Sequence, residues 1–175
     1  DEWRRHGDLL RDVLVGAYPV LNQNHPRGAS LVQEINQWRL DATNSRKIRV
    51  GFIANGFWSH TSAKLVLGLI DLLYKQGGVE IILIEPQDSK RDTLTKAFES
   101  RCHKFVRFPY VGRSMEQCMD DIWALDLHCA IFASVGDNDI IQHLCMGSVA
   151  GVQFQHLWGL PFYSGSDNTV TISME

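Results

Sequence analysis

The sequence lacks an apolar stretch of the length that a membrane-spanning helix needs, which is about 18 residues or more. Its first residues, DEWRR, are charged and differ from a secretory signal peptide. Basic residues are not in excess either, because 17 Lys and Arg stand against 20 Asp and Glu, whereas a nucleic-acid-binding face needs concentrated positive charge. We therefore expect no membrane span and no nucleic-acid partner. We expect a cytoplasmic protein, present in the nucleus as well if its source is eukaryotic.

The sequence also lacks paired cysteines. Its four cysteines contain no C-x-x-C pair, which favours free thiols in a reducing compartment. His103 adjoins Cys102 and His128 adjoins Cys129, but neighbouring side chains on a strand point to opposite faces. We therefore expect no metal site and no bound cofactor.

The first 45 residues have a helical pattern. Apolar residues recur at helical spacing between Leu9 and Leu14 and again between Leu31 and Trp38. A short polar stretch, DATNSRK, then precedes a change of pattern. The sequence predicts a helical N-terminal segment over residues 1–45 and a separate domain over residues 46–175.

Short β-rich runs alternate with helical segments from Ile48 onward. This alternation is typical of right-handed βαβ units. It predicts a Rossmann-like parallel α/β sheet of about six strands with helices on both faces. The expected strands are 48–54, 79–84, 104–108, 128–133, 149–155 and 169–173, and the expected helices include 61–75, 90–101 and 114–125.

The helix expected over residues 61–75 carries leucines at helical spacing. We expect Leu65, Leu69, Leu72 and Leu73 to form its buried side. The pair Gly77 and Gly78 marks the end of this helix, since glycine commonly follows a helix C-terminus.

Ligands of open parallel sheets bind at the carboxyl ends of the strands. The first such loop reads N55-G-F-W-S-H-T61 and holds only one glycine, so a G-x-G-x-x-G dinucleotide motif is absent. A helix N-terminus with His60, Thr61 and Ser62 suits a phosphate or a developing anion. The alternative is that Ser59 caps the helix and that His60 is an ordinary loop residue.

A second candidate loop, residues 156–168, follows the fifth expected strand. Gly159 and Pro161 permit close approach of a ligand to the backbone, and Trp158 has the aromatic character of a pocket wall. The alternative is an ordinary turn that covers the core.

These two loops resemble two motifs of one family. The stretch K47-I-R-V-G-F-I-A-N-G-F-W-S-H-T-S-A-K-L65 resembles the opening of the catalytic region of the O-GlcNAc transferase and SPINDLY family, L-R-V-G-Y-V-S-x-D-F-x-x-H-P. The stretch G151-V-Q-F-Q-H-L-W-G-L-P-F-Y-S-G165 resembles its P-x-Q-x-x-W-L-G-Y-P-G-T. The resemblance covers about three quarters of the chain, from Lys47 to Glu175.

The resemblance implies a GT-B fold, in which two Rossmann-like lobes face a cleft. This chain is then the N-terminal lobe, with the C-terminal lobe absent and tetratricopeptide repeats commonly upstream. By resemblance, His60 is the active-site histidine, and Thr61, Ser62, Trp158, Gly159 and Pro161 contribute to donor or substrate binding. The implied activity is inverting, metal-independent transfer of a GlcNAc-like sugar from a nucleotide sugar such as UDP-GlcNAc to protein Ser or Thr.

The sequence departs from the family pattern at several positions. The aspartate of D-x-x-x-H is Gly56, the proline after the histidine is Thr61, and the small residues of Y-P-G-T are Phe162 and Tyr163. These departures keep a second hypothesis open: a degenerate, non-catalytic lobe that serves as a binding or assembly module. A GT-B-type sugar epimerase is a further alternative.

The chain has no initiator Met and stops at Glu175 directly after an expected strand. We therefore expect it to be a fragment of a longer protein. We expect the fragment alone to be inactive as a transferase, because half of the donor site would be missing and positioning supplies most of the catalysis.

Overall fold

The computed structural model describes residues 2–40, 47–59, 61–86, 90–133, 139–157 and 169–173. All strand pairs in its single six-stranded sheet are parallel, and the strand order is β3-β2-β1-β4-β5-β6. The strands are β1 (Ile48–Ile53), β2 (Val79–Glu85), β3 (Lys104–Arg107), β4 (Cys129–Phe132), β5 (Val152–Leu157) and β6 (Thr169–Ser173). The prediction of a Rossmann-like parallel sheet of about six strands is confirmed.

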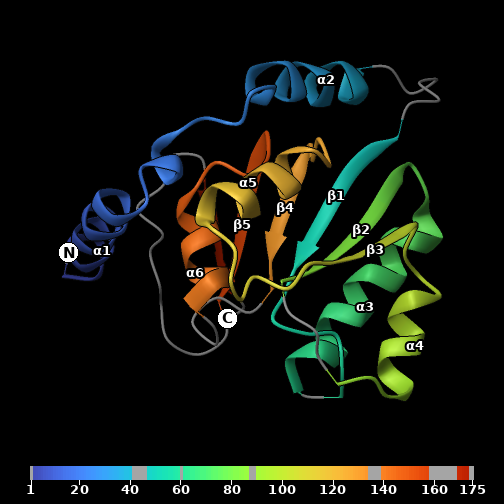
Figure 1. Ribbon diagram of the computed structural model, residues 1–175. Coiled ribbons are helices and arrows are strands. Elements are labelled where there is room, and N and C mark those ends of the chain that lie inside the picture. Colours follow the sequence, from blue (N-terminus) through green and yellow to red (C-terminus); the bar gives the residue numbers. More distant parts are fainter. Residues whose placement is uncertain are drawn as a thin grey trace.

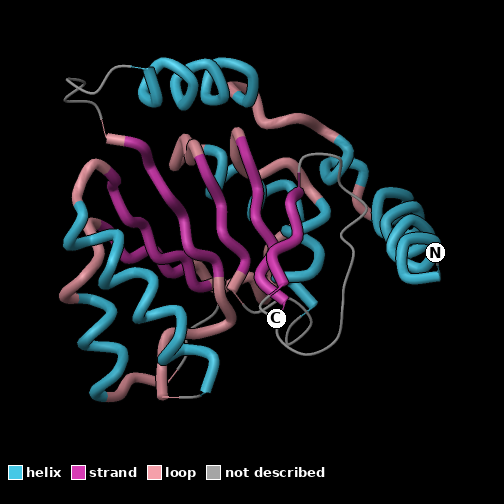
Figure 2. Tube along the Cα trace, turned by 180° about the vertical axis from the view of Figure 1, so that it is seen from behind, coloured by secondary structure: helices cyan, strands magenta, loops and turns pink. Residues whose placement is uncertain are grey.

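Helices cover both faces of this sheet (Figures 1 and 2). The first face packs against α3 (Thr61–Gln76) and α4 (Thr93–Glu99), and the second packs against α5 (Met115–Trp123) and α6 (Asp139–Met146). Each face has its own apolar core, because alternate strand residues such as Phe52 and Ile53 point to opposite sides. Helices on both faces are therefore confirmed as well.

Three helical elements precede the sheet: α1 (Glu2–Ala17), the 3₁₀ turn η1 (Pro19–Asn22) and α2 (Gly28–Leu40). Figure 1 shows α2 lying across the amino ends of the central strands. A Cβ atom on Gly151, just before β5, would lie 3.0 Å from the Cβ atom of Leu31 in α2. The helix therefore packs against the strand starts. The predicted domain boundary at residues 45 and 46 stays a prediction.

The predicted buried side of α3 is wrong. Leu65, Leu69 and Leu72 are 50%, 40% and 62% exposed, and Leu73 is only partly buried. The face on the sheet is formed instead by Ala63, Val66 and Ile70. The leucines and the buried residues both recur at helical spacing. The two faces lie about 100° apart around the helix, which is the rotation from one residue to the next. Periodicity alone therefore does not select the buried face.

The ends of the helices follow local sequence signals. Gly77 and Gly78 end α3 with φ angles of +72° and +79°, a left-handed conformation that glycine adopts at little cost. Ser114 caps α5 in a capping box with Gln117. The helix expected over residues 90–101 is shorter in the structure, because Asp92 caps α4 and the helix runs from Thr93 to Glu99.

Candidate functional site

The loop after β1 leaves the central strand at the point where the strand order reverses. Its neighbour β2 lies on one side and β4 on the other, and ligands of this fold class bind in the crevice at that switch. Phe57 anchors the loop, because its ring is 1% exposed and meets Phe98 and Phe105 edge-on at centroid distances of 5.0 and 5.5 Å. The loop is therefore held to the core from the α4 side.

Trp58 folds back onto Gly56 in the same loop. A Cβ atom at position 56 would coincide with the six-membered ring of the Trp58 indole, and even Cη2 would lie only 2.6 Å away. Trp58 is half-buried and Gly56 is buried. In this conformation no side chain fits at position 56, which is the position of the family aspartate in the sequence comparison.

Asp92 clamps the end of the loop. One of its carboxylate oxygens, Oδ2, accepts a hydrogen bond from the Ser59 N–H at 2.8 Å. The other, Oδ1, accepts from the N–H groups of Leu94 and Thr95 and caps α4. The hydrogen bond from Ser59 is the largest cause that lowers the pKa of Asp92, followed by those from the α4 N-terminus. One ionised carboxylate thus joins the loop after β1 to the helix after β2.

A buried ion pair lies at the ends of the two adjacent strands. Glu85, the last residue of β2, is fully buried, and its Oε2 lies 2.6 Å from Nε of Arg107, the last residue of β3. The Arg107 guanidinium also lies 3.9 Å from the centre of the Phe105 ring. This pair fixes the carboxyl edge next to the clamped loop.

A cavity of about 330 Å³ adjoins the Asp92 clamp. Two cationic and two anionic side chains border it, so it is polar without a strong net charge. Its lining residues are Arg91, Asp92, Thr93, Thr95, Lys96 and Glu99.

Most of the site residues expected from the sequence lie outside the described residues. This holds for His60 in the first loop and for Trp158, Gly159 and Pro161 in the second. Thr61 and Ser62 are described in their backbone only, as the first two residues of α3. Their position at a helix N-terminus beyond the clamped loop agrees with the sequence, and their roles stay predictions.

Sequence reasoning gave no role to Gln155, which lies in the carboxyl half of β5. Its side chain is fully buried, and its Oε1 and Nε2 atoms have no hydrogen-bond partner in the part of the chain that the structure describes. Gln153, two residues earlier, is equally buried but accepts from the Val149 N–H and donates to the Cys145 carbonyl. Nothing in the local pattern Q-F-Q distinguishes the two amides.

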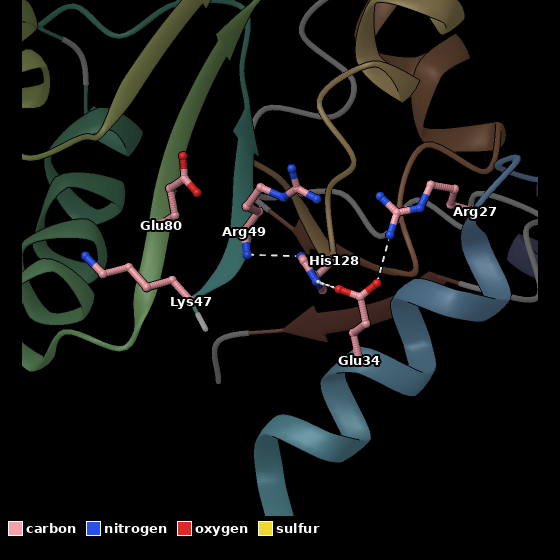
Figure 3. A pocket seen from close by; sticks show the side chains of 6 residues that line it. All are labelled: Arg27, Glu34, Lys47, Arg49, Glu80 and His128. Carbon is pink, nitrogen blue, oxygen red and sulfur yellow. Dashed lines mark hydrogen bonds and ion pairs between the residues drawn. The ribbon is translucent and has the colours of Figure 1, made fainter. Parts of the chain in front are cut away.

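A larger cavity, of about 440 Å³, lies at the opposite, amino edge of the sheet (Figure 3). Arg27 and Glu34 reach it from the α2 side, while Lys47, Arg49 and Glu80 come from the strand starts. Arg27 pairs with Glu34 at 2.8 Å and with Asp126. Arg49 lies 3.6 Å from the same Asp126, so Arg27, Glu34 and Arg49 all take part in ion pairs.

His128 forms the back of the amino-edge cavity. Its Nδ1 accepts a hydrogen bond from the Arg49 N–H at 3.2 Å, so Nε2 carries the proton and donates to Glu34 at 3.1 Å. Burial is the main cause that lowers the pKa of His128, while the hydrogen bond to Glu34 acts in the opposite direction. The neutral imidazole therefore joins β1, β4 and α2.

His103, just before β3, binds the backbone of the neighbouring strand β2 in the same way. Its Nδ1 accepts from the Ile81 N–H at 3.0 Å, and its own N–H donates to the Ile81 carbonyl at 2.8 Å. Both histidines immediately precede a strand and satisfy the backbone of the neighbouring strand. They are thus structural at the amino edge.

A third cavity, of about 180 Å³, lies between the N-terminal helical elements and the α5 and α6 face. Aromatic and apolar side chains form most of its wall. It is lined by Tyr18, Tyr110, Arg113, Met115, Cys118, Ile140 and His143.

Within the described ranges, no group of three or more His, Cys, Asp or Glu residues is arranged to hold a metal ion. All four cysteines are free thiols in the structure. Burial raises the pKa of Cys129 to about 12 and also raises that of Cys145, which keeps both thiols protonated. None of the described helices combines the length and the apolar character that crossing a membrane requires.

No protein-family model and no curated protein matches the chain. Among solved structures, the chain is similar to a mutant of the O-GlcNAc transferase of Thermobaculum terrenum, with a TM-score of 0.52 and 12% sequence identity. The match covers 89% of this chain and 31% of that chain. This likeness shows that the chain has a glycosyltransferase-like fold, and the chain spans about a third of the length of that structure.

Proposed function

We propose that this chain is part of a glycosyltransferase that moves a sugar from a nucleotide sugar to a Ser or Thr hydroxyl of a protein. The observation that carries the proposal is the clamped loop at the switch point of a sheet whose fold resembles that of part of an O-GlcNAc transferase. This loop leads directly into α3, whose first two residues are Thr61 and Ser62. In this proposal His60, the residue before them in the sequence, acts at the same helix N-terminus.

The chemistry of the reaction suits this position. The acceptor oxygen attacks the anomeric carbon, the bond from that carbon to the diphosphate breaks, and the nucleotide leaves with the electron pair. The positive end of α3 stabilises the negative charge that develops on the leaving diphosphate. His60 accepts or relays the proton of the acceptor hydroxyl. No metal ion is needed where backbone N–H groups supply this stabilisation.

The remaining donor contacts in this proposal come from the loop after β5 and from outside the chain. Trp158, Gly159 and Pro161 form one wall around the nucleotide sugar. A second Rossmann-like lobe supplies the opposite wall and most of the nucleotide contacts. The protein acceptor enters between the lobes. Tetratricopeptide repeats upstream in the same polypeptide are a further expected partner of this chain.

The test uses the longest natural polypeptide that contains this chain. Sugar transfer to protein from UDP-GlcNAc, UDP-glucose, GDP-mannose and GDP-fucose is measured for wild type, His60→Ala and Lys75→Ala. Because a general acid or base contributes about 10²–10⁴-fold, we expect His60→Ala to lower turnover at least about 100-fold. Lys75→Ala, at the exposed far end of the same helix, serves as the control and keeps wild-type turnover. Wild-type turnover in His60→Ala would contradict the site assignment.

A second candidate function is a non-catalytic binding module. The Gly56–Trp58 contact favours it, because the indole fills the position of the family aspartate. Calorimetry of the same polypeptide with the four nucleotide sugars separates the two functions. Tight donor binding argues against the degenerate module, and sugar transfer to any protein in a cell extract excludes it.

A further inference from the structure

We propose that the cavity beside the Asp92 clamp binds an oxyanion of a polypeptide, either a phosphate group or a carboxylate. The binding groups are Arg91, Thr93 and Lys96, exposed residues that line this cavity of about 330 Å³. The identity of the polypeptide rests on the proposed function, under which it is the protein acceptor. The cavity then favours acceptors that carry an acidic or phosphorylated side chain near the Ser or Thr that receives the sugar.

The two carboxylates of the cavity are already engaged by other groups. Asp92 accepts hydrogen bonds from the Ser59 N–H at 2.8 Å and from two N–H groups of α4 at 2.9 and 3.1 Å. Glu99 lies 3.6 Å from the guanidinium of Arg107, which is not among the lining residues. The formal balance of charge around the cavity therefore hides a difference between its anions and its cations.

The two cations of the cavity lack such partners. Neither Arg91 nor Lys96 forms an ion pair or a side-chain hydrogen bond with another residue of the described ranges. Arg101, the cation that follows α4, differs because it pairs with Asp71 at 2.7 Å. Arg91 and Lys96 thus present two positive charges to the cavity, and the matching negative charge can come from another molecule.

The start of α4 holds these groups at a fixed spacing. Asp92 and Thr95 form a capping box, so the first turn of the helix has little backbone freedom. Thr93 and Lys96 are three residues apart and lie on the same face of the helix. Arg91 directly precedes the capping residue. The two cations and the hydroxyl are therefore presented together along one side of the cavity.

The chemistry of these three groups suits an oxyanion. The planar guanidinium of Arg91 can donate to two oxygens of one phosphate or carboxylate. A phosphate offers a further oxygen to the Lys96 ammonium and the Thr93 hydroxyl, both of which donate. A carboxylate has no such oxygen. We therefore expect a phosphorylated side chain to bind more tightly than a glutamate side chain.

The Asp92 clamp connects the cavity to the loop of the proposed active site. The carboxylate of Asp92 lines the cavity and binds the Ser59 N–H, and Ser59 directly precedes His60 in the sequence. A polypeptide at the carboxyl edge can therefore place one side chain in the cavity and present a nearby Ser or Thr to the loop. Because Asp92 and Glu99 keep their negative charges, a free phosphate ion binds only weakly, and affinity depends on the rest of the polypeptide.

The experiment uses pools of peptides with a central Ser or Thr and random residues around it. One flanking position is fixed as phosphoserine, glutamate or glutamine, and each flanking position is tested in turn. Sugar transfer from the preferred nucleotide sugar is measured for the longest natural polypeptide that contains this chain. Each exposed charge pair contributes up to about fivefold, so two cations predict a kcat/KM about tenfold higher for phosphoserine than for glutamine. The difference lies in KM for the peptide, and glutamate is intermediate.

Two double variants locate this preference. In Arg91→Gln/Lys96→Gln we expect the three pools to become equivalent while KM for the nucleotide sugar stays unchanged. Lys75→Gln/Lys104→Gln removes two exposed cations at the amino edge and keeps the wild-type preference. Thermal unfolding establishes that each variant is folded.

A charge reversal provides a readout that does not need transfer. Binding of fluorescently labelled pools is followed by anisotropy, with a fourth pool in which the fixed residue is lysine. We expect wild type to bind the phosphoserine pool most tightly. Arg91→Glu/Lys96→Glu should bind the lysine pool most tightly, because the cavity then carries only negative charge.

The outcomes separate this inference from the proposed function. If no pool receives sugar but the preference in binding follows Arg91 and Lys96, the proposed function fails and the oxyanion site stands. If sugar is transferred and the pools are equivalent, or the preference survives in Arg91→Gln/Lys96→Gln, only the inference is overturned. A raised KM for the nucleotide sugar in that variant, with an unchanged KM for the peptide, would assign the two cations to the donor and also overturn it.

Discussion

At the amino edge of the sheet, charged side chains fasten a helix to the strand starts, whereas at the carboxyl edge they fasten a loop and join two strand ends. His128, Glu34 and Arg27 use their hydrogen bonds to fasten α2 to the strands (Figure 3). The loop after β1 uses its backbone and Asp92 to hold Trp58 in place. The amino edge has the larger described cavity, yet its polar groups serve the fold. Cavity size alone therefore does not decide which edge of the sheet binds a ligand.

The largest expected loss of stability comes from removing the buried ion pair at the carboxyl edge. Arg107→Ala leaves the Glu85 carboxylate fully buried without its guanidinium, and breaking a buried pair in this way costs about 3 kcal/mol or more. Urea unfolding monitored by circular dichroism measures the loss. Arg101→Ala is the matched control, because Arg101 pairs with Asp71 at a similar distance, 2.7 Å, on the surface. A loss for Arg107→Ala no larger than that for Arg101→Ala would contradict a structural role for the buried pair.

The next comparison is between the two glutamines of β5. Gln153→Leu removes two hydrogen bonds and leaves the Val149 N–H and the Cys145 carbonyl without them, so we expect a loss of about 1–3 kcal/mol. Gln155→Leu replaces an amide that makes no hydrogen bond within the described chain. We expect the stability to stay within about 0.5 kcal/mol or to rise.

Urea unfolding of both glutamine variants at neutral pH provides the measurement. An equal loss for the two variants would mean that the Gln155 amide has a partner, such as a buried water molecule. A gain or no change for Gln155→Leu would place an unsatisfied polar group in the carboxyl half of the sheet, where a ligand or water molecule can satisfy it.

The smallest expected effect is a change in the pH dependence of stability that His128 causes at the amino edge. The pKa of His128 is lower in the folded protein than its unfolded value of about 6.5, so the unfolded chain binds more protons below that pH. The stability contributed by neutral His128 is therefore complete above about pH 6.5 and declines as the pH falls toward the folded pKa. Glu34, Arg49 and Arg27 are the charged groups that act on this imidazole.

We expect His128→Asn to reduce the pH dependence of stability, because the Asn oxygen replaces the Nδ1 acceptor without titrating. The difference from wild type is at most about 1.4 kcal/mol per pH unit for one proton. Urea unfolding at pH 7.5 and 5.5 measures it. His25, whose pKa burial also lowers, leaves a residual dependence in the variant. An unchanged pH dependence in His128→Asn would mean that this imidazole does not contribute.

The sequence predicts the fold well because the fold depends on local signals. Alternating strands and helices, the glycines after α3 and the Ser114 cap are all short-range features, and the structure contains each of them. The buried side of α3 is the exception. Its leucine stripe and the Ala63–Val66–Ile70 stripe are both periodic, and only packing on the sheet decides between them.

The candidate site is less predictable because its contacts join distant residues. Ser59 meets Asp92 across 33 positions, and Glu85 meets Arg107 across 22. The sequence identifies the loop that holds Trp58 but not that the indole rests on Gly56, since rotamer and backbone together determine that contact. The contacts of His128 and His103 are equally hard to predict from the sequence, because their partners are backbone atoms of the neighbouring strand.

The most direct test of the account is hydrogen–deuterium exchange of the longest natural polypeptide, with and without a nucleotide sugar that it binds. We expect protection in residues 54–59 and 90–96 at the carboxyl edge and no change in residues 28–40 or 47–49 at the amino edge. Protection confined to the amino edge, around Arg49 and α2, would contradict the account and make the cavity of Figure 3 the binding site.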